Sequence, residues 1–327
     1  MPPPASGPGL MPESLTARVR ERPEPRTGGA LGAALFSALM FGACVRLPLL
    51  FPFALLAPFP LLVVRLRHGM VPAVLGTVSA AALIGSLVGG WPGLIYLLLV
   101  APMLLIGESM ARGRGMLRGC GWAFALLALE MCTALVFLND AMRALALASF
   151  EHSRSREFLE GLRASMPAEQ VDAFAEQAAA AYEAMLVVYP AAYIIVVALF
   201  VLINASLLRL YLRRRDPGWL DAGEFEGVRW PFTLAVAFVA MGLAVLSPLL
   251  RPAAYNGLLI LAFFFGLQGL AVVCFYAQRL AAPPLLRAAV LVLVLINPWA
   301  PQILALIGLF DIWFDFRKWA EPPEARA

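Results

Sequence analysis

Five polar side chains interrupt long apolar runs of this sequence, and they are its main candidates for chemistry. They are Glu130, Asn204, Gln268, Asn297 and Asp311. An ionised side chain at the centre of a lipid-embedded helix costs roughly 2.5–3.5 kcal/mol on insertion scales, so such groups should face protein or a water-filled cavity. Carboxyl and carboxamide groups in that setting could contact a polar solute, a proton or a cation. We therefore treat all five as candidate solute or polar-core contacts.

Glu130 is the deepest of these groups, because it stands near the middle of the apolar run 119–139. It either contacts a substrate, proton or cation, or it tethers two helices as a protonated or paired carboxyl. The sequence leaves these two interpretations open. Glu108, by contrast, precedes Arg112 by four residues, and this spacing favours an ion pair at the membrane interface.

Asn204 and Gln268 each lie within an apolar run, where a carboxamide either binds a solute or bonds to a neighbouring helix. Interhelical hydrogen bonds of this kind are common in membrane bundles, so the sequence favours a packing role. Asp311 lies near the end of the last apolar run and is followed by the charged residues Asp315, Arg317 and Lys318. A local salt network is the first interpretation of that group.

Signatures of catalysis and of metal binding are missing from the sequence. The only histidines are His68 and His152, which are far apart, and no two cysteines form a CxxC pair. The sequence contains no phosphate-binding glycine loop, no HExxH zinc motif and no nucleophile elbow. It therefore predicts no enzymatic activity, no metal and no cofactor.

The elements that must position the polar side chains are apolar helices. Of the 327 residues, 61% are hydrophobic and 14% charged, and the mean hydropathy is +0.81. Soluble domains are about 45–50% apolar and about 25% charged, so the apolar excess here must face lipid. We predict an all-α polytopic transmembrane helical bundle of about 8–10 spans. Its nine apolar segments are 30–45, 47–64, 71–90, 92–109, 119–139, 184–209, 231–250, 255–278 and 285–314.

Proline interrupts two parts of this pattern. The first two apolar segments are short and Pro-rich, which predicts a tight hairpin or a partly re-entrant pair. The segment 285–314 contains Asn297-Pro298-Trp299-Ala300-Pro301, so it forms either one kinked span or two half-helices. Glycine in segment 255–278 affects helix packing instead. Gly266 and Gly269 have no side chain and allow a neighbouring helix to approach closely.

The distribution of arginine predicts the orientation in the membrane. The net charge is +4, but the basic residues lie in short loops between apolar runs rather than on one surface, which argues against a nucleic-acid partner. Most arginines fall in the loops on the same side as the N-terminus. The rule that cytoplasmic loops are positively charged then places the N-terminus in the cytoplasm.

The domain organisation follows from the same patterns. Residues 1–28 form a Pro- and Arg-rich cytoplasmic tail that we expect to be disordered. Residues 29–318 form the transmembrane domain, with an acidic extracytoplasmic insert at 140–183, and residues 319–327 form a short C-terminal tail. Within the insert, the stretch 165–169 predicts the start of a helix that continues to about Tyr211 and kinks near Pro190.

Several short stretches, taken in their order along the chain, resemble a known family. They are Pro60 to Gly69, Asn204 to Arg209, Leu267 to Leu270 and Gly308 to Arg317. Together they resemble the YybS-like family of bacterial inner-membrane proteins, whose function is unknown. That family is similar in fold to the substrate-binding (S) components of energy-coupling-factor vitamin transporters. The resemblance covers about residues 30–318, implies a bacterial inner-membrane protein, and assigns no substrate.

Two functions are compatible with these features. The favoured one is a transporter-like or solute-binding membrane component, with a solute held among the spans. The alternative is a non-catalytic scaffold in envelope assembly, whose polar residues only pack helices. The expected partners are the lipid bilayer, with a small-molecule solute or a second membrane protein, and no nucleic acid.

Overall fold

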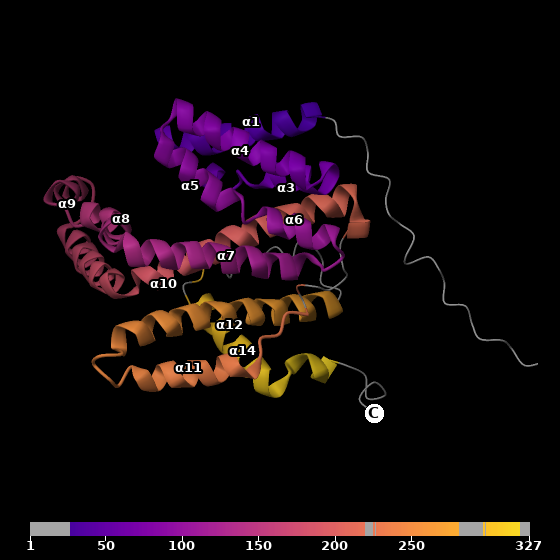
Figure 1. The fold of residues 1–327 in the computed structure, drawn as a ribbon. Coiled ribbons are helices and arrows are strands. Elements are labelled where there is room, and N and C mark those ends of the chain that lie inside the picture. The colour runs from indigo at the N-terminus through magenta and orange to yellow at the C-terminus, as the bar shows by residue number, and fades with distance from the viewer. Residues whose placement is uncertain (1–26, 220–224, 226, 281–296, 298, 321–327) are drawn as a thin grey trace, which may run out of the picture. The chain divides into compact units, whose positions relative to one another are not determined.

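The computed structural model describes residues 27–219, 225, 227–280, 297 and 299–320. The regular elements among these residues are all helical (Figure 1). By chain contacts the protein divides into two compact units, residues 1–111 and 112–327, which we describe separately. The predicted tail 1–28 falls almost entirely outside the described residues, as do residues 285–296 of the predicted last segment.

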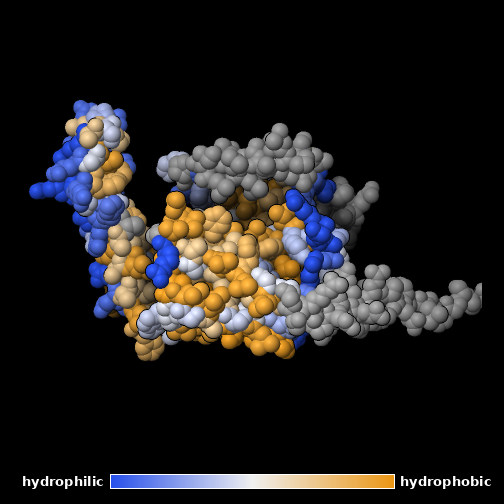
Figure 2. Space-filling model, turned by 90° about the horizontal axis from the view of Figure 1, so that it is seen from above, coloured by the Kyte–Doolittle hydropathy of each residue, from blue (hydrophilic) through white to orange (hydrophobic). Residues whose placement is uncertain are grey.

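Six of the described helices are long and apolar enough to cross a membrane. They are Gly29–Arg46, Met70–Leu87, Gly90–Ala111, Met116–Phe137, Ala168–Arg215 and Arg251–Arg279, and Phe232–Ala244 and Ala300–Phe314 are shorter apolar helices. Large apolar side chains cover much of the surface, as Figure 2 shows in orange. Trp91 and Val136, for example, are each 74% exposed. An apolar exterior of this extent requires lipid as its solvent, and the predicted all-α polytopic class is confirmed.

The described part of the first unit, from residue 27 to 111, consists of short or medium helices. In chain order they are α1 (Thr27–Arg46), η2 (Pro48–Leu50), α2 (Phe51–Ala54), α3 (Phe59–His68), α4 (Met70–Leu87), α5 (Gly90–Val100) and α6 (Leu104–Ala111). The Pro-rich segment 47–64 therefore forms short helical pieces, because proline removes backbone donors and ends helices. The last of these pieces, α3, packs on α1, α4 and α6.

Polar contacts of Ser37 and Arg65 cross the interior of the first unit. The Ser37 hydroxyl on α1 lies 2.6 Å from the Tyr96 hydroxyl on α5 and donates to the carbonyl oxygen of Ala57. Arg65 on α3 forms a salt bridge with Glu108 on α6. Its side chain passes over Gly107, where an added Cβ would lie only 2.8 Å from the Arg65 Cγ. The structure thus gives Glu108 a partner that its spacing from Arg112 did not reveal.

The second unit contains the longer helices. In chain order, the elements among its described residues are α7 (Met116–Phe137), α8 (Asn139–Ser153), α9 (Arg156–Arg163), α10 (Ala168–Arg215), η3 (Pro217–Trp219), α11 (Phe232–Ala244), α12 (Arg251–Arg279), α14 (Ala300–Phe314) and η4 (Phe316–Ala320). In the predicted insert 140–183, α8, α9 and the first part of α10 form a hydrophilic projection, the blue lobe in Figure 2.

Helix α10 confirms the predicted helix start and its continuation. It begins at Ala168, directly after Pro167, and runs for 48 residues. At 1.5 Å per residue this is about 72 Å, more than twice the thickness of a bilayer core. The helix therefore extends well beyond the membrane, and its first part belongs to the hydrophilic projection.

Pro190 lies inside α10, and next to it the side chain of Asn256 on α12 takes the place of one backbone hydrogen bond of the helix. Asn256 accepts a hydrogen bond from the backbone nitrogen of Ala191 and donates one to the carbonyl oxygen of Val187, each at 2.8 Å. Its amide thus stands between two groups that would bond to each other in a regular helix. These two hydrogen bonds join α10 to α12.

A very close helix crossing in the second unit joins α12 and α14. A Cβ added at Gly269 would collide with the backbone oxygen of Leu304, and one at Gly308 would collide with that of Phe265. Only glycine permits this approach. The sequence indicated the α12 side of the crossing through Gly266 and Gly269, and the structure adds Gly308 on the opposite helix.

Candidate functional site

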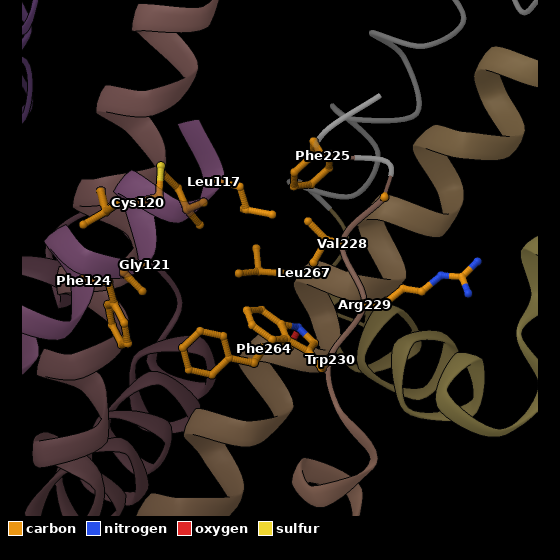
Figure 3. A pocket seen from close by; sticks show the side chains of 14 residues that line it. Leu117, Cys120, Gly121, Phe124, Phe225, Val228, Arg229, Trp230, Phe264 and Leu267 are labelled. Carbon is orange, nitrogen blue, oxygen red and sulfur yellow. The ribbon is translucent and has the colours of Figure 1, made fainter. Parts of the chain in front are cut away.

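A pocket of about 350 Å³ lies in the second unit between α7, α10, α12 and the chain that leads into α11 (Figure 3). Its walls come from four stretches of sequence that are far apart. The lining residues are Leu117, Cys120, Gly121, Phe124, Ala198, Val201, Leu202, Phe225, Gly227, Val228, Arg229, Trp230, Phe264 and Leu267.

The interior of the pocket is apolar and partly aromatic. The Phe264 ring makes edge contacts with Trp230 on one side, at 5.2 Å between centroids, and with Phe124 on the other, at 5.5 Å. Arg229 is the one charged residue among those that line it. In Figure 3 its guanidinium points away from the labelled apolar side chains. A pocket with these walls favours a hydrocarbon or aromatic group over a polar solute.

One side of the pocket is formed by three consecutive residues, Val228, Arg229 and Trp230, which we call the pocket wall. Each of them is held by a hydrogen bond or an ion pair. The Val228 carbonyl accepts a 2.8 Å hydrogen bond from Nη2 of Arg317. Arg229 forms a 2.9 Å ion pair with Asp315. The Trp230 backbone nitrogen donates to Oε1 of Gln268 at 2.9 Å, and its indole nitrogen donates to the Phe264 carbonyl at 2.8 Å.

The side chains that hold the wall belong to a polar cluster of Gln268, Asp311, Asp315, Arg317 and Lys318, which is buried at Gln268, Asp311 and Arg317. Gln268 donates to Oδ2 of Asp311 at 2.8 Å, and Arg317 forms an ion pair with the same oxygen at 3.4 Å. Gln268, Asp311 and Arg317 are 1%, 4% and 3% exposed. The more exposed Lys318 pairs with Asp315 at 3.2 Å. The local salt network predicted from the sequence is present, and Gln268 extends it.

Local chain geometry brings Arg317 back toward the cluster. Asp315 ends α14 with a left-handed backbone, φ 43°, which aspartate tolerates better than most residues. The next residue, Phe316, donates its backbone nitrogen to Oδ1 of Asp311 and accepts a hydrogen bond from Tyr276 on α12. The chain reversal thus places η4 beside α12.

The charge of Arg317 is balanced inside the cluster. Burial lowers the pKa of the Arg317 guanidinium, and the nearby Asp311 carboxylate opposes that change. Arginine remains protonated in proteins, so the buried group is a cation that depends on its carboxylate partner. The cluster therefore connects the pocket wall to Gln268, Asp315 and Arg317.

The structure unites two of the five predicted site residues, because Gln268 and Asp311 bond directly to each other. Asn204 is fully buried on α10 and donates to the Phe200 carbonyl of its own helix. Asn297 accepts from the Trp299 backbone nitrogen in the turn before α14. Glu130 is partly exposed on α7. None of the five lines the pocket described here, and their role as solute contacts stays a prediction.

Sequence reasoning missed the pocket because its residues carry no distinctive signal. Trp230 resembles an interfacial aromatic residue, and Leu117, Val201 and Leu267 are ordinary residues of apolar helices. The available signal was indirect, since Gln268 next to Leu267 marks an internal face of α12. Among the described residues, no three His, Cys, Asp or Glu side chains form a group that could hold a metal ion.

The long apolar helices, the lipid-facing surface and the buried polar cluster define a polytopic α-helical membrane protein. The chain belongs to the family described as "Predicted membrane protein (DUF2232)", whose model matches residues 34–312. Neither the curated proteins nor the solved structures compared with the chain give a match. The family description states membrane residence and no activity.

Proposed function

We propose that this protein is a non-enzymatic membrane component that binds an apolar or amphipathic molecule in the pocket between α7, α10 and α12. The proposal keeps the transporter-like or solute-binding role expected from the sequence. The proposed binding site is the apolar pocket and not the five polar residues. Of these five, Gln268 bonds to the pocket wall, and Asp311 bonds to Gln268.

One observation carries the proposal, namely a preformed apolar pocket with a fixed wall. Ligand pockets are typically about 300–1,000 Å³, mostly apolar and largely preformed. The pocket volume of about 350 Å³ falls at the lower end of that range. The pocket wall is bonded to α12, α14 and η4, so the ligand does not have to organise it.

We further propose that the protein lies in the bacterial inner membrane with its N-terminus in the cytoplasm. The support is the arginine content of the loops 112–118 and 209–229. In this orientation the hydrophilic projection of α8, α9 and the start of α10 lies outside the cytoplasm. The YybS-like name and the likeness to transporter S components belong to the same proposal.

A scaffold is the second candidate, and the hydrophilic projection favours it. The projection is acidic, and its Arg163–Asp172 ion pair is exposed on both sides. A charged helical surface outside the bilayer suits a protein partner. Under this alternative the pocket would only be a packing gap between helices.

Photochemical labelling separates the two candidates. The protein is reconstituted in vesicles that contain phosphatidylglycerol and phosphatidylcholine in equal amounts, each with a photoreactive acyl chain, and labelled peptides are mapped by mass spectrometry. We expect labels to concentrate on the stretches 117–124, 198–202 and 264–267, each of which contributes lining residues to the pocket. Labels spread evenly over the lipid-facing helices would contradict a binding site.

A matched pair of glycine variants sharpens this test. An added Cβ meets open space at both Gly121, which lines the pocket, and Gly242 on α11, which does not. Gly121→Leu should fill part of the pocket and reduce labelling of residues 264–267. Gly242→Leu adds the same side chain elsewhere in the second unit and should leave labelling unchanged. Equal labelling in the two variants would overturn the proposed function.

A further inference from the structure

We infer that the pocket takes one hydrocarbon chain of a lipid with an anionic headgroup, and that arginines at one end of the second unit bind the headgroup. This inference rests on the proposed function and names the class of ligand. It follows from the position of the pocket along its helices, from the charges at that end, and from the size of the pocket.

The pocket lies close to the end of the second unit where α7 begins and α10 finishes. Leu117 is the second residue of α7, and the lining residues of α7 extend only to Phe124. On α10 the lining residues Ala198, Val201 and Leu202 lie about two thirds of the way along the helix, toward its C-terminal end. Both groups line one pocket, so the start of α7 and the end of α10 lie at the same end.

That end of the unit is rich in arginine. Arg118 is exposed directly after the lining residue Leu117, and Arg229 belongs to the pocket wall with 51% of its side chain exposed. Arg209 follows Leu202 by seven residues, or about 10 Å along a helix. The helix α10 then ends with Arg213, Arg214 and Arg215.

Acidic residues at this end do not cancel the positive charge. The segment after α10 contains Asp216, Asp221, Glu224 and Glu226, of which only Asp216 is among the described residues. Basic residues still outnumber acidic ones over 112–118 and 209–229 together. Asp311 and Asp315 are engaged by Arg317, Arg229 and Lys318 within the polar cluster.

Bilayer chemistry supplies a ligand that matches this combination. Anionic lipids make the cytoplasmic leaflet negative and attract arginines near its surface. In the proposed orientation the basic end faces that leaflet. The pocket has apolar walls and a volume of about 350 Å³, which suits a single chain and leaves a charged headgroup outside, among the arginines.

The test compares two lipids that differ only in the headgroup. Phosphatidylglycerol and phosphatidylcholine with the same photoreactive chain are used in separate vesicle preparations, and labelling of residues 264–267 is quantified. We expect phosphatidylglycerol to label the pocket several-fold more strongly. Neutralising arginines near the surface should move the ratio toward one by up to roughly fivefold, so Arg118→Gln should lower it and Arg118→Gln/Arg213→Gln, which changes two exposed arginines at this end, should lower it further.

The controls separate charge from pocket occupancy. Arg143→Gln removes a charge from α8, which follows the opposite end of α7, and should leave the ratio unchanged. Salt at about 0.5 M should reduce the ratio through screening. Equal pocket labelling by both lipids would overturn the headgroup assignment and leave the proposed function standing. Loss of pocket-specific labelling with both lipids would overturn the proposed function itself.

Discussion

The two units bury polar side chains in different ways. In the first unit, Ser37–Tyr96 and Arg65–Glu108 are separate pairs, each joining helices of the interior. In the second unit, Gln268, Asp311 and Arg317 form one continuous cluster that also binds the backbone of a pocket wall. Buried polar side chains therefore have different structural surroundings in the two units. The distinguishing feature is the attachment of a polar cluster to the boundary of an apolar cavity.

This contrast gives the polar clusters different expected roles. A pair that joins two helices should affect stability when it is removed and nothing else. A cluster that fixes a pocket wall should affect both stability and ligand occupancy. Variants in the two units therefore test the comparison directly, with unfolding temperature and pocket labelling as separate measurements.

The largest effect is expected for Asp311→Leu. This change leaves the guanidinium of Arg317, which is 3% exposed, without its buried carboxylate partner. Breaking a buried ion pair in this way costs about 3–5 kcal/mol in the free energy of unfolding. Thermal unfolding of the purified protein in detergent should show a large decrease in midpoint, together with a loss of pocket labelling.

A double variant distinguishes an unpaired charge from general disruption of the core. Asp311→Leu/Arg317→Met removes both charges and should recover much of the lost stability, because replacing a whole buried pair by apolar residues is often neutral. Pocket labelling should stay low, since Val228 has still lost its hydrogen bond from Arg317. A double variant no more stable than Asp311→Leu would contradict this account of the cluster.

A smaller effect is expected for Gln268→Met, which keeps the length of the side chain. The change removes the acceptor for the Trp230 backbone nitrogen and the donor to Asp311. Unsatisfied buried groups cost about 1–3 kcal/mol each. The loosened wall should also reduce labelling of residues 264–267.

Asn204→Leu is the matched control for Gln268→Met. It removes another buried carboxamide, but one that donates to the Phe200 carbonyl of its own helix. We expect lower stability with unchanged labelling of the pocket. If both variants changed labelling equally, Gln268 would have no special relation to the pocket wall.

The sequence predicted features that depend on local pattern. The start of α10 at Ala168 follows from Pro167, and the all-helical class follows from apolar run lengths. Gln268 and Asp311 were found because polar groups in apolar helices must face an interior. Their positions were therefore predictable, although their contact with each other was not.

Features that depend on long-range contact were not predictable. Glu108 pairs with Arg65, 43 residues away, and local spacing gives no sign of this partner. Asn256 forms hydrogen bonds with the backbone of α10 beside Pro190, at a separation of 65 residues or more. The pocket itself joins four separate stretches of ordinary apolar sequence. In each case the partner is set by helix packing, on which a single sequence carries little information.

The smallest effect is expected for Tyr96→Phe in the first unit. The change removes only the hydroxyl beside Ser37, whose own hydrogen bond to the Ala57 carbonyl remains. The edge contact of the ring with Phe41, at 5.3 Å between centroids, is also kept. Loss of one hydrogen bond costs about 0.5–1.5 kcal/mol, so the unfolding midpoint should fall slightly. Pocket labelling should be that of the wild type; a clear decrease would show that polar contacts in the first unit also control the pocket, and the contrast between the two units would fail.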